Sequence, residues 1–202
     1  MIINNLLQHI FSAQSNILVL RTLNSRVIGL SGRETARISK LSIRTVQNTL
    51  AHLESFGLVN RTIGGRDHLF TLDRKNRIVI KLIKYIFEFE NEFKNEIHSL
   101  IKKKLSALTS SLILFGSVAR SEEDSTSDFD LCIVYVKNKS KIESAVSDLR
   151  DKLYDDYKIT LAPLYILETE FRKRAKLNLS PVNSILKEGV LLTGKSIRGL
   201  LK

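Results

Sequence analysis

The stretch that decides the fold is residues 115–131, FGSVARSEEDSTSDFDL. An apolar run, SLILF (111–115), leads into a Gly-Ser pair, and a polar, acidic segment follows. Asp128 and Asp130 then stand at the head of a second apolar run, LCIVYV (131–136). Both apolar runs predict strands. Two carboxylates at the entrance of a strand, in a chain of formal net charge +11, need a chemical explanation.

The two aspartates favour a metal site. They are two residues apart in the predicted strand, so Asp128 and Asp130 face the same side of it. Neighbouring like charges repel, and Mg²⁺, which prefers oxygen ligands, is the natural compensator. Upstream, Gly116 lets a phosphate approach the backbone, and the Ser117 hydroxyl can donate to it. A phosphate cradle beside paired carboxylates is the equipment of phosphoryl or nucleotidyl transfer.

The spacing of these residues resembles a known family signature. In the minimal branch of the DNA polymerase β-like nucleotidyltransferase superfamily, G-S-x-A-R-G is followed after five residues by S-D-x-D-L. The matching residues are Gly116, Ser117, Ala119, Arg120, Ser127, Asp128, Asp130 and Leu131. NSILKEGVLLTGK (183–195) is similar to the family's closing segment, so the resemblance covers about residues 108–195. It implies Mg²⁺-dependent transfer of a nucleoside monophosphate from an NTP to a hydroxyl acceptor.

The resemblance also implies roles for single residues. Asp128 and Asp130 are the expected catalytic and metal-binding pair. The residues expected to bind the nucleotide are Gly116, Ser117, Arg120 and Ser127. For Arg120 the alternative is a structural ion pair with an acidic residue of the following segment, which contains Glu122, Glu123 and Asp124.

One position departs from the family pattern in a way that bears on activity. The family carries a third carboxylate on the next strand, and alignment with KITLAPLYI (158–166) puts Thr160 there. Asp155 and Asp156 precede that strand in the wrong register. The sequence therefore leaves two hypotheses open. One is an active nucleotidyltransferase; the other is a transcriptional regulator or antitoxin-like protein whose transferase domain only binds nucleotide or a partner.

A second resemblance lies before the signature. Residues 15–24 predict a helix, Ser31 and Ser42 can cap two more (32–39 and 43–56), and LVNRTI-GG-RDHLFTL (58–72) predicts a hairpin. This order, with the phrase LAHLESFGLVNRT, resembles a winged helix-turn-helix DNA-binding domain over about residues 12–75. Residues 1–75 hold ten Lys and Arg against four Asp and Glu, a net charge of +6.

The predicted third helix indicates how such a domain would read DNA. Its buried face is expected to hold Ile43, Val46, Leu50 and Leu53. The residues expected to contact duplex DNA are Arg44, Thr45, Gln47 and Asn48 on this helix and Arg61 and Arg66 at the hairpin. The alternative is a protein–protein or oligomerisation module with solvated arginines.

Between the two modules, no glycine or proline occurs from residue 66 to residue 115. Apolar residues recur there at helical spacing and predict one long amphipathic helix. They are Leu82, Ile86, Phe89, Phe93, Ile97, Leu100 and Leu105. The stripe either packs on both neighbouring domains or forms the seam of a homodimer. We therefore expect an α/β (α+β) protein with a winged helix (1–76), a connecting helix (77–107) and a nucleotidyltransferase-fold domain with a small mixed sheet (108–202).

Composition bounds the remaining alternatives. The chain has 202 residues, 43% of them hydrophobic, which is enough for packed cores. Its single cysteine, Cys132, is expected to be a small buried residue, and four scattered histidines make no zinc site. Neither a signal peptide nor a membrane span is expected, which favours a cytoplasmic protein. Expected partners are an NTP, double-stranded DNA and a protein that is toxin-like or serves as acceptor.

Overall fold

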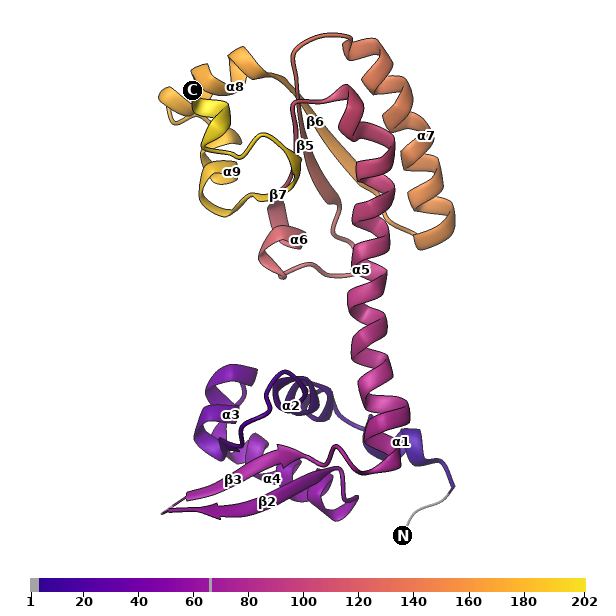
Figure 1. Cartoon of the computed structure of the whole chain (residues 1–202), viewed down its shortest axis with the longest axis vertical. Coiled ribbons are helices and arrows are strands. Elements are labelled where there is room, and N and C mark those ends of the chain that lie inside the picture. Colours follow the sequence, from indigo (N-terminus) through magenta and orange to yellow (C-terminus); the bar gives the residue numbers. More distant parts are fainter. Residues whose placement is uncertain (1–3, 66) are drawn as a thin grey trace. The chain divides into compact units, whose positions relative to one another are not determined.

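The computed structural model describes residues 4–65 and 67–202 of the chain (Figure 1). It divides into two compact units, Met1–Glu92 and Phe93–Lys202. In the described part of the chain, no helix is long and apolar enough to cross a membrane.

The first unit is a winged helix-turn-helix. Its elements are α1 (Leu6–Ile10), α2 (Gln14–Asn24), β1 (Leu30–Ser31), α3 (Gly32–Ser39), α4 (Ile43–Ser55), β2 (Val59–Gly64), β3 (Asp67–Leu72) and the π-helical turn η1 (Val79–Ile83). The strands form an antiparallel sheet in the order β1-β3-β2. Helices α2, α3 and α4 pack around one core that contains Leu20, Leu50 and Leu53. The predicted order of helices and hairpin is confirmed.

Side-chain caps explain why the chain turns between α3 and α4. The Ser31 hydroxyl accepts from the Glu34 amide at 3.2 Å, and the Glu34 carboxylate accepts from the Ser31 amide at 2.9 Å. Lys40, with φ 57°, ends α3 in the left-handed conformation. Ser42 then caps α4 by accepting from the Thr45 amide at 3.1 Å. Both caps expected from the sequence are present.

The buried face of α4 differs from the prediction at one residue. Val46, Leu50 and Leu53 are buried, but the side chain of Ile43 is 50% exposed. Because α4 begins at Ile43, this side chain lies at the end of the helix, beyond the core. Ile43 instead lines a surface groove described below.

The long helix α5 (Lys84–Leu105) buries two short stripes instead of one continuous stripe. In the first unit the buried stripe begins in η1 with Val79 and Ile83 and ends in α5 with Phe87; in the second unit it consists of Ile97, Ile101 and Leu105 of α5. The predicted continuous stripe is wrong at Phe89 and Phe93, which are 55% and 38% exposed. The two stripes contribute to separate cores, and Phe89 and Phe93, which lie between them, remain partly exposed.

The second unit contains a four-stranded mixed sheet. After the 3₁₀ turn η2 (Ser106–Leu108), its elements are β4 (Ser111–Leu114), α6 (Gly116–Arg120), β5 (Phe129–Tyr135), α7 (Lys139–Tyr157), β6 (Leu161–Leu167), α8 (Glu168–Lys176), α9 (Val182–Glu188), β7 (Val190–Gly194) and η3 (Gly199–Leu201). The strand order is β6-β5-β4-β7. Only β5 and β6 pair in parallel, and α7 connects them. The predicted mixed sheet is confirmed, but β7 and α8 were not predicted.

Helices cover both faces of this sheet (Figure 1). Leu131 and Ile133 of β5 point into a core shared with α7 and the end of α5. Cys132 and Val134 point the other way, into a core shared with α8 and α9. Burial raises the pKa of the Cys132 thiol to about 12, so this cysteine is a packing residue, as predicted.

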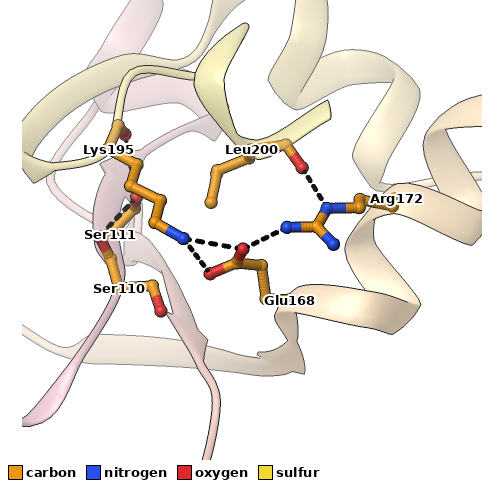
Figure 2. Close-up of polar contacts among 6 residues, drawn as sticks. All are labelled: Ser110, Ser111, Glu168, Arg172, Lys195 and Leu200. Atoms are coloured by element: carbon orange, nitrogen blue, oxygen red, sulfur yellow. Dashed lines mark hydrogen bonds and ion pairs between the residues drawn. The ribbon is translucent and has the colours of Figure 1, made fainter. Parts of the chain in front are cut away.

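An ion cluster around the buried Glu168 ties the end of the chain to α8 (Figure 2). The Glu168 carboxylate accepts from Lys195 Nζ at 2.8 and 3.0 Å and from Arg172. Arg172 Nε donates to the Leu200 carbonyl at 2.9 Å, and the Ser111 hydroxyl donates to the Lys195 carbonyl at 2.8 Å. The lysine holds the pKa of Glu168 below its usual value. The cluster joins β4, α8 and the segment after β7.

Candidate functional site

Gly116 brings the Gly-Ser turn and the aspartates together. It is the first residue of α6 and has φ 72°, a conformation that disfavours any residue with a side chain. A Cβ at this position would overlap the Asp130 carboxylate. The Phe115 amide donates to the Asp130 carbonyl at 3.1 Å, which fixes the same junction. The two halves of the predicted site are therefore adjacent, with the half-buried Ser117 in the first turn of α6.

The aspartate pair shares one face of the sheet. Asp130 is the second residue of β5, and Asp128 immediately precedes the strand. Burial and the charge of Asp128 raise the pKa of Asp130, and Arg120 opposes the rise. A nearby cation would stabilise the ionised form of this carboxyl, which its surroundings disfavour. The donor set of two carboxylates is the kind that Mg²⁺ accepts.

The acidic segment between the turn and the aspartates is held by its own side chains. The Asp124 carboxylate accepts from the Thr126 amide at 2.8 Å, the Thr126 hydroxyl at 2.7 Å and the Ser127 hydroxyl at 3.2 Å. Ser127 Oγ accepts in turn from the Asp124 amide at 3.0 Å. These hydrogen bonds lower the pKa of Asp124, and the bonds from Thr126 have the largest effect. Ser127 thus shapes the loop that leads to Asp128.

Arg120 forms ion pairs with two carboxylates. Its Nε donates to Glu122 at 2.7 Å and its Nη1 donates to Glu188, at the end of α9, at 2.9 Å. Both raise the pKa of Arg120. The ion pair with Glu122 was the alternative expected from the sequence. Glu188 was not expected, because it lies far along the chain and nothing local marks it.

The strand beside the aspartates presents no carboxylate to them. In the parallel register Phe129 pairs with Leu161 and Asp130 with Ala162, and the Phe129 amide donates to the Thr160 carbonyl at 2.8 Å. Thr160 is therefore the neighbour of Asp128, as the sequence alignment indicates. Among residues 4–65 and 67–202, no three His, Cys, Asp or Glu side chains lie close enough together to hold a metal ion.

Asp155 and Asp156 do not fill this position. Both lie in the last turn of α7, which packs on the face of the sheet that holds Leu131. Asp130 shares the opposite face with Cys132, because side chains alternate along a strand. Asp156 pairs with Lys152 at 3.3 Å. Asp155 lines, together with Thr160, a hollow of about 310 Å³ at the start of β6.

The residues expected to contact DNA are placed differently from one another. Arg44, Gln47 and Asn48 are exposed on α4, whereas Thr45 is half-buried and bonded to Ser42 at 2.8 Å. Arg61 lies on β2 and pairs with Glu54 of α4 at 3.2 Å between Nε and Oε1. Arg66 lies outside the described residues.

A groove of about 500 Å³ lies between α4 and the hairpin. Gln47 and Arg61 line it, together with Glu54, which was not among the predicted site residues. Further polar lining residues are Ser31, Arg33, Asp67 and His68. The groove therefore carries both signs of charge, and Arg61 is partly neutralised within it.

Comparison with known families identifies the second unit. The family "Nucleotidyltransferase domain" matches residues 90–192, half of the chain. No curated protein matches the chain.

Several solved structures resemble parts of the chain. A predicted DNA-binding transcriptional regulator from E. coli is 25% identical, with a TM-score of 0.37, over 41% of this chain and 84% of that one. A toxin-antitoxin crystallised with AMP-PNP is 17% identical, with a TM-score of 0.36, over 53% and 77%. MepR, a transcription regulator of a Staphylococcus aureus multidrug efflux pump, is 20% identical, with a TM-score of 0.37, over 50% and 83%.

Proposed function

Because the chain belongs to the nucleotidyltransferase domain family, we propose that its second unit binds an NTP with Mg²⁺ and transfers a nucleoside monophosphate to a hydroxyl acceptor. The observation that carries the proposal is the close packing of Gly116 against Asp130. It brings a phosphate-binding turn and a carboxylate pair into one site, as this chemistry requires.

Each residue has a distinct part in this proposal. Asp128 and Asp130 would hold Mg²⁺, and Gly116 and Ser117 would bind the phosphates. When bound, the ion neutralises charge on the phosphate oxygens. Arg120 would act on the site indirectly, by fixing the loop through Glu122 and α9 through Glu188. Ser127 would act through Asp124 on the approach to Asp128.

A second candidate function follows from the strand beside the aspartates. Thr160 and Ala162 offer no carboxylate to accept the proton of an acceptor hydroxyl. A site with two carboxylates can still bind NTP and Mg²⁺. The alternative is thus a regulator, antitoxin-like in organisation, whose second unit senses nucleotide or docks a protein partner.

The first unit would bind double-stranded DNA under either candidate. Arg44, Gln47 and Asn48 are exposed on α4, and Arg and Asn or Gln side chains can read base edges in a major groove. Arg61 at the hairpin would contact the DNA backbone in competition with Glu54. The net charge of +6 over residues 1–75 supports a polyanionic partner.

One experiment separates the two candidates. The full chain is incubated with Mg²⁺ and NTPs labelled at the α-phosphate, alone and with candidate small-molecule and protein acceptors. Transfer that is lost in Asp128→Ala and in Asp130→Ala supports the enzyme. NTP binding without transfer supports the nucleotide sensor. Transfer that survives both substitutions contradicts the proposed site.

A further inference from the structure

The tip of the β2–β3 hairpin holds an isoleucine in solvent. Ile63 is 83% exposed and immediately precedes the Gly64-Gly65 pair. Gly64 packs against Leu69 so closely that a Cβ would overlap the leucine side chain, and Gly65 has φ 67°. Glycine is therefore required at the two positions that follow Ile63.

The strand register places Ile63 on the face that lines the groove. Ile63 pairs with His68, and Arg61 pairs with Phe70. Directly paired residues share a face of the hairpin, and so do residues two apart along a strand. Arg61, His68 and Phe70 line the groove that α4 also borders. Ile63 therefore extends this face to the tip.

An apolar side chain at this point is unfavourable in water but not against stacked bases. It contributes nothing to the core of the first unit, and it lies on a basic domain beside Arg61. Proteins that enter the minor groove often insert an isoleucine or a similar residue between base steps, which unstacks the step and kinks the duplex. The net charge of +6 over residues 1–75 favours DNA over an uncharged apolar partner.

We propose that Ile63 is an apolar wedge that enters the minor groove of duplex DNA and partly unstacks one base step. The inference rests on the proposed DNA binding of the first unit and adds a contact that carries no charge. Flexible pyrimidine–purine steps cost least to unstack, so the wedge favours TA and CA steps. It would give the protein a preference for deformable sequence at a position that α4 does not read.

The test uses the full chain and two probes. A short random-sequence duplex with an end label reports affinity at several salt concentrations. A duplex with 2-aminopurine in a TA step reports unstacking, because the fluorescence of this base rises when it leaves the stack. The variants are Ile63→Ala, the charge variant Arg44→Ala and the matched control Ile28→Ala, whose isoleucine is also 83% exposed but lies before β1.

Ile63→Ala is expected to weaken binding about tenfold with an unchanged salt dependence, because the contact is apolar. It should also suppress the fluorescence rise, whereas Ile28→Ala changes neither. Arg44→Ala should lower the slope of log affinity against log salt by about 1. If Ile63→Ala binds and unstacks like the wild type, DNA binding stands and the wedge is wrong.

Two other outcomes also overturn the wedge. If the wild type shows no salt-dependent binding, the DNA-binding proposal fails and the wedge fails with it. If Ile63→Ala converts a dimer to a monomer in sedimentation, Ile63 is a contact between copies of the chain. Sedimentation of the wild type and Ile63→Ala at equal concentration decides this point.

Discussion

Gly116 packs against Asp130 so closely that a side chain at position 116 would overlap the carboxylate. Gly116 follows the end of β4 and Asp130 is the second residue of β5, and these two strands are antiparallel neighbours. The glycine is thus required by the carboxylate as well as by any phosphate that approaches the turn. This one relationship makes the turn and the aspartate pair a single site.

Replacing this glycine should damage the site specifically. We expect Gly116→Ala to abolish binding of NTP with Mg²⁺, because the new Cβ displaces the Asp130 carboxylate. The positive φ adds a destabilisation of about 1–2 kcal/mol. Calorimetric titration and thermal unfolding measure both effects. Gly32→Ala is the control, since a Cβ at Gly32 meets nothing within 4 Å; equal effects of both substitutions would refute the prediction.

The raised pKa of Asp130 predicts a trade between stability and function. The folded state raises the pKa of Asp130 above its ordinary value of 3.8, so the folded protein binds this proton more tightly than the unfolded chain does. As the pH rises above 3.8, ionisation of Asp130 therefore lowers the stability of the folded protein. Asp130→Asn should therefore raise the Tm of the Mg²⁺-free protein at pH 7, with a gain that disappears below pH 3.8. The same variant should lose Mg²⁺-dependent NTP binding.

The control for this prediction is Asp156→Asn, which removes a carboxylate of α7 that pairs with Lys152. It should leave NTP binding unchanged. Thermal unfolding between pH 3 and pH 8 supplies the comparison. An Asp130→Asn variant that is less stable than the wild type at every pH would be incompatible with the argument.

A carboxylate placed beside Asp128 should strengthen the metal site. Thr160 precedes β6 at the level of Asp128, so Thr160→Asp would supply the missing third carboxylate. We expect Mn²⁺ affinity in the presence of NTP to rise about tenfold, since affinity follows the number of charged ligands. Titration of the free Mn²⁺ signal in electron paramagnetic resonance measures it. Asp155→Asn should have no effect; a loss there would mean that Asp155 reaches the site.

Glu54 should restrain DNA binding by neutralising Arg61. Glu54→Gln frees Arg61 from its ion pair with Glu54. We therefore expect tighter duplex binding, and a slope of log affinity against log salt concentration that is steeper by about 1. The matched control is Glu88→Gln, which removes the same charge from an ion pair with Lys84 on α5. Fluorescence anisotropy across salt concentrations provides the readout. An equal gain in both variants would assign the effect to net charge alone.

The buried Glu168 should stabilise the second unit. Its lowered pKa means that its contribution is complete above the ordinary value of 4.5 and is lost as the pH falls through the folded-state pKa. Glu168→Gln should cost about 1–3 kcal/mol at pH 7, because Lys195 and Arg172 lose a charged acceptor. Thermal unfolding should show this deficit at pH 7 and its disappearance well below pH 4.5.

Glu170→Gln is the matched control for Glu168. It lies on the same helix and loses one pair with Arg174, of which both side chains are partly exposed. Solvent-exposed pairs contribute little, so we expect Glu170→Gln to leave the free energy of unfolding nearly unchanged. Similar deficits for both variants would show that the cluster around Glu168 has no special role.

Local sequence patterns predicted the features that depend on neighbouring residues. Ser31 and Ser42 marked the starts of α3 and α4, because a cap bonds to amides three residues away. The period of two placed Asp128 and Asp130 on one face. Gly116 was expected to admit a phosphate, but its contact with Asp130 could only be seen once β4 and β5 were paired.

Features that depend on tertiary packing were missed. The short run VLLTG forms β7 because β4 offers an edge to pair with, and its five residues show no alternation. The ion pairs of Arg120 with Glu188 and of Arg61 with Glu54 join separate elements. The stripe of α5 was assigned as continuous because spacing alone cannot show that one helix serves two cores.

The most direct test of the central claim is a calorimetric titration of the full chain with a non-hydrolysable NTP analogue and Mg²⁺. One analogue should bind per chain, and binding should be lost when Mg²⁺ is chelated. It should also be lost in Asp128→Ala and in Gly116→Ala, because the turn and the carboxylates form one site. Undiminished binding in both variants would contradict the account.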